Sequence, residues 1–367
     1  PVAERVKALV SVPVATVGRV VSVEAGEKIL EDGAADIIAY GRSLMCDPDI
    51  ALKAATGEPI RECLNCNKGC VDAIQNRKYI SCVLNAENGD EATIAIKPGE
   101  GDKKIAVVGG GIAGLEAARV AAKRGYDVTV YEASDHLGGQ IVLAAAPPRK
   151  DEIMRSVEYY EKILPGLGVK VELSHAATAE DLNAADAAIV AVGAHDVVIP
   201  VSGADSEKVV SSWDVLAGKA MPHGETIILG GGGVGCETAQ FLIEHGVTDV
   251  RVMDTKRVGN KMGMLRTMFL DIEYPGETIK KSRGSKVTAV GDHEITYAFT
   301  NKAKKTVEKT RHFDSLVIAT GMHSRPTQDL TDACSELGIP CDIIGSARKA
   351  DMGIEATAEA YAAAMKV

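Results

Sequence analysis

The sequence has few aromatic residues and no long apolar run. Aromatics make up 4% of the 367 residues, and no apolar stretch approaches the roughly 18 residues that a membrane-spanning helix requires. Basic residues form no stripe and the formal net charge is −10, which argues against nucleic acid and anionic membrane surfaces as partners. The chain does not begin with a secretory signal pattern. We therefore expect a cytoplasmic protein that binds neither nucleic acid nor membrane.

Histidine and cysteine differ in what they indicate about metal binding. The eight histidines show no metal-ligand spacing. Eight cysteines occur, and half of them lie in one short stretch with the spacing C-x2-C-x3-C-x11-C. The length of the chain and this clustering favour a metal site in a reducing compartment over a disulfide framework. The clustered residues are Cys63, Cys66, Cys70 and Cys82.

The spacing of these four cysteines favours iron–sulfur chemistry. A 4Fe-4S cubane takes four thiolates, often three close together and one remote, whereas structural zinc usually takes two separated pairs. Since three of the cysteines lie within eight residues, the 4Fe-4S cluster is preferred and zinc is the alternative. The remaining cysteines are expected to be small, buried apolar residues; these are Cys46, Cys236, Cys334 and Cys341.

Glycine is abundant, with 37 residues, and marks a dinucleotide-binding signature. Gly109, Gly111 and Gly114 follow the apolar strand expected at 105–108. The first glycine permits a tight turn, the second lets the backbone approach a pyrophosphate at a helix N-terminus, and the third allows close helix–strand packing. Glu132 ends the next strand and is placed to accept ribose hydroxyls. A glycine-rich turn without a ligand is the alternative.

An internal repeat produces a second signature 121 residues later. Gly230, Gly232 and Gly235 occupy the corresponding positions, and Asp254 is the acidic partner. An acid at this position favours an unphosphorylated ribose, so NADH is preferred over NADPH. The two residues after Thr255 are basic and can soften that preference. Two nucleotide sites are the natural inference.

Other glycines close apolar strands near these signatures. The runs AAIVAVG and SLVIATG end at Gly193 and Gly321. We expect them to be the crossings between a flavin domain and an inserted nicotinamide domain, with plain buried strand ends as the alternative. Gly139 and Gln140 lie in the sequence HLGGQI and are expected to line the flavin.

Residues 1–62 show a β-α-β-α pattern that suits a parallel sheet. The strands expected at 12–18 and 35–41 are apolar, which predicts burial. They end in Gly18-Arg19 and Gly41-Arg42. In a β/α barrel such positions lie at the carboxyl face, where phosphate sites are built, and arginine binds phosphate bidentately. Two ordinary surface arginines are the alternative.

Taken together, these features resemble the fused NADH:flavin oxidoreductases of the old yellow enzyme type. That family includes 2,4-dienoyl-CoA reductase, 2-enoate reductase and trimethylamine dehydrogenase. The most specific stretch is IIAYGRSLMCDPDIALKAATGEPIRECLNCNKGCVD. The resemblance implies an α/β protein in which the end of an FMN-binding TIM barrel precedes a 4Fe-4S segment and two Rossmann-like domains.

The resemblance also implies domain boundaries and site residues. Residues 1–62 would be the last two β/α units of the barrel, and 63–102 the 4Fe-4S segment with a linker. Residues 103–200 and 323–367 would form the FAD-binding domain, and 201–322 the NAD(H)-binding domain. Arg19 and Arg42 match FMN-phosphate positions, and the four clustered cysteines match cluster ligands. The FAD-contacting positions are matched by Gly109, Gly111, Gly114, Glu132 and Gln140.

The chain departs from the family pattern at three places. One is the stretch 258–286, which does not follow the family's usual helix-rich pattern. Only the last two barrel strands are present, so FMN binding would require a missing N-terminal part or a separate barrel-bearing polypeptide. The family usually has Gly-Asp on the FAD ribityl chain, whereas this chain has Gly345-Ser346. The hydroxyl of Ser346 can still hydrogen-bond the flavin, with weaker FAD binding expected.

The resemblance implies an enzyme that passes electrons from NADH to FAD, then to a 4Fe-4S cluster and to FMN. FMN would reduce the activated C=C bond of a small-molecule substrate, of the enoate or enoyl-CoA type. The alternative function is an electron-input module that supplies a separate partner, and a zinc-stapled nucleotide-binding protein without turnover is a third hypothesis. No residue is a clear general acid, so the catalytic residues stay unassigned. A homo-oligomer is expected, because the family tends to assemble.

Overall fold

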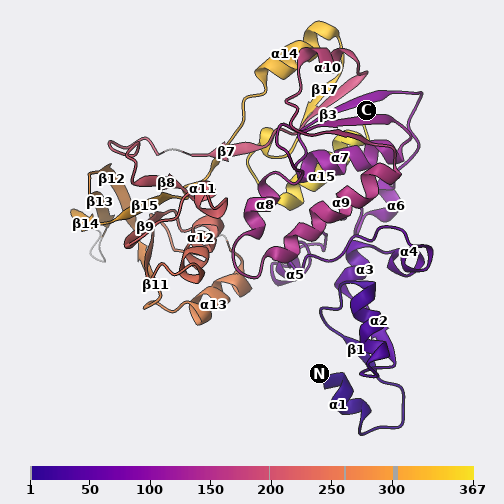
Figure 1. Cartoon of the computed structure of the whole chain (residues 1–367), viewed down its shortest axis with the longest axis horizontal. Coiled ribbons are helices and arrows are strands. Elements are labelled where there is room, and N and C mark those ends of the chain that lie inside the picture. Colours follow the sequence, from indigo (N-terminus) through magenta and orange to yellow (C-terminus); the bar gives the residue numbers. More distant parts are fainter. Residues whose placement is uncertain (1, 198, 260–261, 301–304) are drawn as a thin grey trace. The chain divides into compact units, whose positions relative to one another are not determined.

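The computed structural model describes residues 2–197, 199–259, 262–300 and 305–367 (Figure 1). The chain divides into two compact units. The first comprises residues 1–141, 152–193 and 326–367, and the second comprises residues 142–151 and 194–325. Among the described residues, no helix is both long enough and apolar enough to cross a membrane.

The first unit is built on a five-stranded parallel sheet in the order β17-β6-β3-β4-β5. Its strands are β3 (Lys104–Val108), β4 (Asp127–Tyr131), β5 (Lys170–Glu172), β6 (Ala187–Val190) and β17 (Cys341–Ile343). Its helices include α7 (Ile112–Lys123), α9 (Arg155–Gly166), α10 (Ala179–Asn183), α14 (Gln328–Leu337) and α15 (Gly353–Ala364). The short helix η2 (Gly345–Ala347) also belongs to this unit, whereas α8 (Gln140–Ala145) and η1 (Asp151–Met154) each span a boundary with the segment 142–151 of the second unit.

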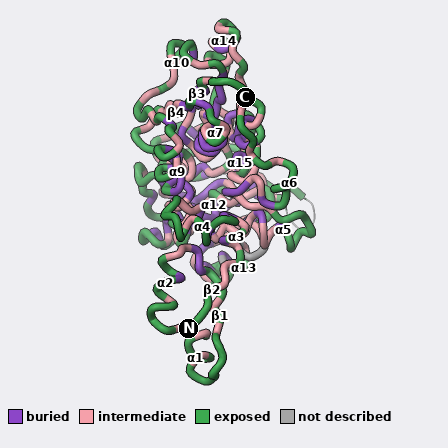
Figure 2. The backbone as a smooth tube through the Cα atoms, turned by 90° about the vertical axis from the view of Figure 1, so that its right-hand side faces the viewer, coloured by how far each residue is buried: buried purple, intermediate pink, exposed green. Residues whose placement is uncertain are grey.

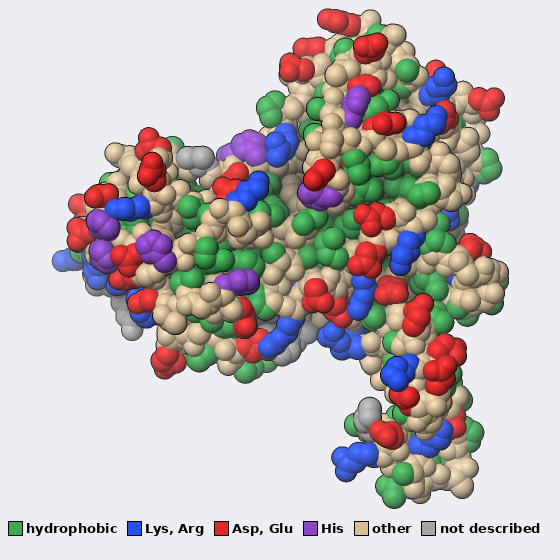
Figure 3. All heavy atoms as spheres, viewed as in Figure 1, with side chains coloured by type: hydrophobic (Ala, Val, Ile, Leu, Met, Phe, Trp, Pro, Cys, Tyr) green, Lys and Arg blue, Asp and Glu red, His purple; other side chains and the backbone are tan. Residues whose placement is uncertain are grey.

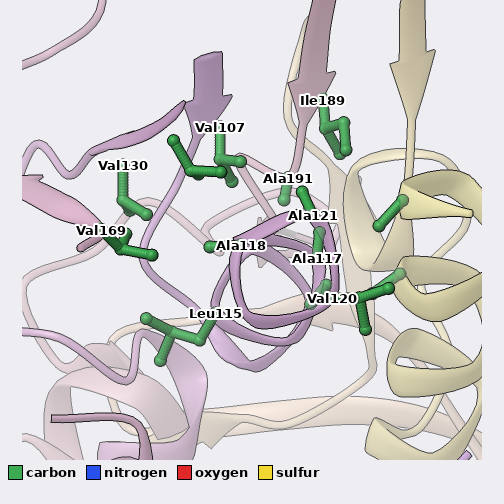
Figure 4. Close-up of a cluster of buried hydrophobic side chains, with 14 of the residues drawn as sticks. Val107, Leu115, Ala117, Ala118, Val120, Ala121, Val130, Val169, Ile189 and Ala191 are labelled. Carbon is green, nitrogen blue, oxygen red and sulfur yellow. The ribbon is translucent and has the colours of Figure 1, made fainter. Parts of the chain in front are cut away.

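The side chains of β3 point alternately to the two faces of the sheet, and both sets are apolar, which explains why the sheet is covered on both faces. Ile105 and Val107 join one apolar cluster with α7, α9 and α15, whereas Ala106 and Val108 join another with α10 and α14. Figure 4 shows Val107 and Val130 of the sheet pointing toward α7, where Ala118 lies. A strand that is apolar at four consecutive positions, 105–108, therefore lies in the middle layer of a three-layer structure.

The second unit repeats this architecture with a five-stranded parallel sheet in the order β11-β10-β9-β15-β8. Its strands are β8 (Val209–Ser211), β9 (Glu225–Leu229), β10 (Asp249–Asp254), β11 (Ile279–Arg283) and β15 (Ser315–Ile318). Helices α11 (Ser212–Leu216), α12 (Gly233–Glu244) and α13 (Met264–Glu273) contribute to the apolar cluster on one face. The other face packs against an antiparallel sheet of β12 (Ser285–Val290), β13 (Glu294–Thr300) and β14 (Thr306–His312). A short antiparallel pair, β7 (Ala194–Asp196) and β16 (Met322–Ser324), completes the unit.

The N-terminal segment of the first unit carries a small parallel pair of strands, β1 (Ala15–Val17) and β2 (Ile37–Ala39). Its helices are α1 (Val2–Lys7), α2 (Val23–Glu31), α3 (Arg42–Cys46) and α4 (Ile50–Thr56). The prediction that both strands are buried is wrong for this structure. Val17 is 70% exposed and Ile37 is 53% exposed, because a two-stranded sheet contacted by α2 leaves its remaining surface open. Figure 2 shows the tube around α1 and β1 as mostly exposed.

The cysteine segment lies between this pair of strands and β3. It contains two short helices, α5 (Val71–Gln75) and α6 (Glu91–Ile94), and is otherwise irregular. Figure 3 shows acidic and basic side chains interspersed over the visible face, as the modest charge imbalance of the sequence leads one to expect.

We expect Gly235→Ala to destabilise the second unit, since the new Cβ would lie 1.9 Å from the carbonyl oxygen of Gly230. Overpacking of this kind costs about 1–3 kcal/mol, so the denaturant midpoint of that unit should fall. Gly233→Ala is the matched control in the same helix, because its Cβ would meet nothing within 4 Å. An equal midpoint for both variants in guanidinium titrations would contradict this account of the turn.

Candidate functional site

The first glycine turn joins β3 to α7 in a conformation that only glycine tolerates well. Gly109 has φ +110°, in the left-handed region, and a Cβ there would lie 2.4 Å from the oxygen of Ala191. A Cβ on Gly114 would lie 1.8 Å from the oxygen of Gly109. Gly111 is the N-cap of α7. The turn therefore lets the helix N-terminus approach the strand closely, which is the geometry of an anion site.

The acidic residue after β4 is held beside this turn. Glu132 accepts a hydrogen bond of 2.6 Å from the backbone N–H of Gly110. Its other carboxylate oxygen accepts from the backbone N–H and the hydroxyl of Ser134, at 2.8 and 2.7 Å. The carboxylate is thus fixed at the carboxyl edge of the sheet, next to the helix N-terminus.

Most other predicted flavin residues gather at the same edge. Gly139 approaches the turn, since a Cβ on it would lie 3.3 Å from Cα of Gly111. Gln140 begins α8, and its side-chain amide nitrogen is 3.4 Å from the position of a Cβ on Gly193. Ser346 lies in η2, which approaches α7 because a Cβ on Gly345 would be 2.9 Å from Cβ of Ala113.

The second glycine turn reproduces the first within its own unit. Gly230 has φ +109°, and a Cβ on it would lie 2.2 Å from the oxygen of Ala319. Gly232 is the N-cap of α12. Asp254 accepts from the backbone N–H groups of Gly231 and Lys256, each at 2.6 Å. Gly321 follows β15 with φ +134°.

The four clustered cysteines converge on one pocket in the first unit. The pocket is lined by Arg42, Met45, Cys46, Cys63, Leu64, Cys66, Asn67, Gly69, Cys70, Ser81, Cys82, Val83 and Leu84. Asn65 and Asn67 have φ of +52° and +62°, and these left-handed residues bend the segment around the pocket. A Cβ on Gly69 would lie 2.3 Å from the oxygen of Ser81, so this position requires glycine.

Backbone N–H groups point at the sulfur atoms. The N–H of Asn65 donates to Cys63 Sγ at 3.4 Å, and the N–H of Lys68 donates to Cys66. Leu84 and Asn85 both donate to Cys82. Such bonds stabilise thiolates and are typical of the surroundings of bound metal and iron–sulfur groups.

Burial and local hydrogen bonds give the thiols different acidities. Burial raises the pKa of Cys63, and it raises the pKa of Cys66 to about 11. The pKa of Cys82 is lowered, chiefly by a hydrogen bond from the Cys46 thiol. Cys46 itself has a raised pKa, because its proton is shared with Cys82 and the side chain is buried. A bound metal centre would keep the four clustered thiols deprotonated.

The two predicted FMN-phosphate arginines contact groups of the first unit. Arg19 forms an ion pair of 2.9 Å with Glu152. Arg42 donates to the side-chain oxygen of Asn67 at 2.5 Å and lines the cysteine pocket. Gly18 has φ +113° and Gly41 is the N-cap of α3. Their assignment to FMN stays a prediction.

Sequence reasoning missed two residues at the cysteine pocket. Cys46 was expected only to fill apolar space, but its thiol contacts Cys82. Arg61 is 7% exposed, and its guanidinium donates to the carbonyl oxygen of Leu84 at 2.9 Å. Neither residue belongs to the cysteine spacing, so no motif marked them; Arg61 stands two residues before Cys63, which is the only local signal.

A second group of possible ligands lies in the second unit. Among the residues that the structure describes, His293, His312 and Asp314 bring their ligand atoms within 4.8 Å of one another. Histidines near β13 and β14 are visible on the surface in Figure 3. The Lys208 ammonium lies 2.9 Å from Nε2 of His293, and a cation in this position opposes metal binding.

The chain is similar to known reductases over most of its length. It matches the family described as pyridine nucleotide-disulphide oxidoreductase over residues 89–145 and 103–353. It is 39% identical to bilirubin reductase of Mediterraneibacter gnavus over 369 aligned residues, which cover 98% of this chain and 56% of that protein. It is 40% identical to cinnamate reductase of Clostridium sporogenes over 269 residues, which cover 71% of this chain and 40% of that protein.

A solved structure shows the same architecture. The complex of 2-naphthoyl-CoA reductase with 2-naphthoyl-CoA aligns with a TM-score of 0.90 and 26% identity, over 98% of this chain and 55% of that one. The chain thus spans about half the length of the relatives it matches. These similarities confirm the resemblance that the cysteine and glycine motifs indicated.

We expect Asp254→Ser to weaken the preference for NADH over NADPH by about tenfold, or ~1.4 kcal/mol. The substitution removes a fixed carboxylate that repels a 2′-phosphate. The ratio of the two dissociation constants measures this preference. Asp249→Ser is the control, since Asp249 begins the same strand and pairs with Lys280 at 2.7 Å. A ratio unchanged in Asp254→Ser would exclude this role for the carboxylate.

Proposed function

The chain belongs to the pyridine nucleotide-disulphide oxidoreductase family, and we propose that it conducts electrons from NADH through FAD and a 4Fe-4S cluster to FMN. The substrate would be a compound with an activated C=C bond, of the enoate or enoyl-CoA type. When bound, the flavin converts hydride transfer into single-electron steps that the iron–sulfur cluster can carry. The protein supplies binding, orientation and electrostatics.

One contact in the first unit carries this proposal. Ile112 is the first residue of α7, directly after the glycine turn, and it packs against the apolar cluster that includes Cys63 and Cys82. The apolar residues around the cysteine pocket therefore adjoin the helix that follows the dinucleotide turn. Electron transfer between a flavin and a cluster needs such proximity.

The donor set of the pocket fits a cubane better than zinc. Tetrahedral zinc with Zn–S bonds of about 2.3 Å would hold its sulfurs about 3.8 Å apart. In the described part of the chain, the group of three or more ligand atoms lying mutually within 4.8 Å contains no cysteine. Among the described residues, no three of the clustered sulfurs therefore lie as close together as one zinc ion requires. We assign the pocket to a polynuclear cluster with Cys63, Cys66, Cys70 and Cys82 as its ligands.

The residues at the two glycine turns would hold the nucleotides. The N-termini of α7 and α12 provide free N–H groups for the pyrophosphates. Glu132 would orient the ribose of FAD, and Asp254 the ribose of NADH. Residues 1–62 would contribute two strands of the FMN barrel, with Arg19 and Arg42 as its phosphate ligands. Their present partners, Glu152 and Asn67, would then have to release them.

We expect the anaerobically reconstituted chain to hold about four irons and four sulfides, and NADH to bleach its flavin absorbance. Cys66→Ala should lose the iron and the broad visible absorption while keeping FAD, because Cys66 lies outside the glycine turn. Metal analysis, sulfide analysis and visible spectra measure this.

Cys334→Ala is the control for that experiment. Cys334 is buried, whereas Cys66 is partly buried, and Cys334 belongs to the apolar cluster on the α10/α14 face of the sheet. It should leave iron and flavin contents unchanged. Zinc in place of iron in the wild-type chain, or no bleaching of bound FAD by NADH, would refute the proposal.

A further inference from the structure

Arg61 is a buried cation at the base of the cysteine segment. It stands two residues before Cys63 and is 7% exposed. Its guanidinium donates a hydrogen bond of 2.9 Å to the carbonyl oxygen of Leu84, which lines the cysteine pocket. Leu84 in turn stands two residues after Cys82. The side chain of Arg61 therefore links the two ends of the segment that carries all four proposed cluster ligands.

Other buried contacts hold Arg61 in this position. Asp47 is fully buried, and its carboxylate accepts the backbone N–H of Arg61 at 2.9 Å. The residue after Leu84 is Asn85, whose side-chain amide donates to the carbonyl oxygen of Met45 at 2.9 Å. Both ends of the bond between Arg61 and Leu84 are thus tied to the end of α3, so the guanidinium is fixed beside the cysteine pocket.

The charge of this guanidinium has no counter-ion within the described part of the chain. The Asp47 carboxylate is paired with the Lys53 ammonium at 2.6 Å. No described acidic side chain forms an ion pair with Arg61, whose guanidinium bonds a backbone carbonyl, and its Nε atom is buried without a hydrogen-bond partner. Burial of an unpaired charge is costly. A positive charge in this position therefore favours an anionic group in the adjoining pocket.

An iron–sulfur cluster with four thiolate ligands would be that anion. Its reduction adds one further negative charge, which a fixed cation stabilises. Solvent screens this attraction little, because Arg61 and Leu84 are buried. The guanidinium stays protonated throughout the physiological pH range. Net charge and surroundings are among the factors that set cluster potentials, so a cation held at the pocket makes the cluster easier to reduce.

Resting on the proposed 4Fe-4S function, we infer that Arg61 is the buried counter-ion of the cluster and that its charge raises the reduction potential of the cluster. Leu84 and Asp47 hold this charge in place. Arg61 is neither a ligand nor a catalytic residue, and none of its covalent bonds forms or breaks during electron transfer.

The test is a redox titration of the anaerobically reconstituted chain, in which EPR detects the reduced cluster. Arg61→Gln removes the charge and keeps an amide donor for Leu84. At a fixed potential the ratio of reduced to oxidised cluster should then fall several-fold; tenfold corresponds to about 59 mV for one electron. Arg61→Lys keeps the charge and should restore most of the ratio.

Arg124→Gln is the matched control. Arg124 belongs to the same unit, and its guanidinium also donates to backbone carbonyl oxygens, those of Ala364 and Val367 at 2.6 and 2.8 Å. Neither partner lines the cysteine pocket. This variant should titrate as wild type.

Iron content separates the possible failures. A wild-type chain without iron would overturn the proposed function and this inference together. If wild type and Arg61→Gln both hold a full cluster and have equal midpoints, only the inference is overturned. A midpoint as low in Arg61→Lys as in Arg61→Gln would also overturn it, since the charge would not be the cause. Loss of iron from both variants would do the same, because Arg61 would then act in holding the cluster.

Discussion

The close approach of a helix N-terminus to β3 in one sheet and to β9 in the other is the constraint on which both proposed nucleotide sites depend. At Gly114 and Gly235 a side chain would meet the carbonyl of the first glycine at 1.8 and 1.9 Å. The residue directly after the first glycine, Gly110 or Gly231, donates its N–H to Glu132 or Asp254 at 2.6 Å. One steric condition therefore fixes together the helix N-terminus and the carboxylate that are proposed to hold the pyrophosphate and the ribose.

The first of these turns also bears on the cysteine segment. Ile112, the first residue of α7, packs against the apolar cluster that contains Cys63, Leu64 and Leu84. The helix that would bind FAD therefore adjoins the apolar residues around the pocket. A substitution that loosens the turn is expected to disturb both sites, whereas the cysteine ligands can be changed without altering the glycines.

Much of this arrangement could be predicted from the sequence because its signals are local. The glycine spacings and the acids after β4 and β10 each specify one strand–turn–helix unit, and the repeat predicted two of them. The predicted burial of β1 and β2 was wrong. An apolar run shows that a strand is suited to burial, but it does not show whether other helices or strands cover it. The contact of Cys46 with Cys82 joins positions separated by an irregular segment, so no periodicity could indicate it. The contact of Arg61 with Leu84 depends on tertiary structure in the same way.

A cluster in the cysteine pocket would need positive charges and hydrogen-bond donors around it in addition to its four thiolate ligands. A cluster held by four thiolates is an anion in a largely apolar cavity, and burying an uncompensated charge is costly. Burial raises the pKa of Cys63, and the charge of Arg42 on the pocket wall opposes that rise, while the charge of Arg61 favours the thiolate of Cys82. The Nε atom of Arg61 is buried without a hydrogen-bond partner, so the hydrogen-bonding capacity of this guanidinium is incompletely used by the protein. The positive charges of Arg42 and Arg61 would offset part of the charge of an anionic cluster, and the backbone N–H groups that donate to the sulfurs would stabilise the remainder.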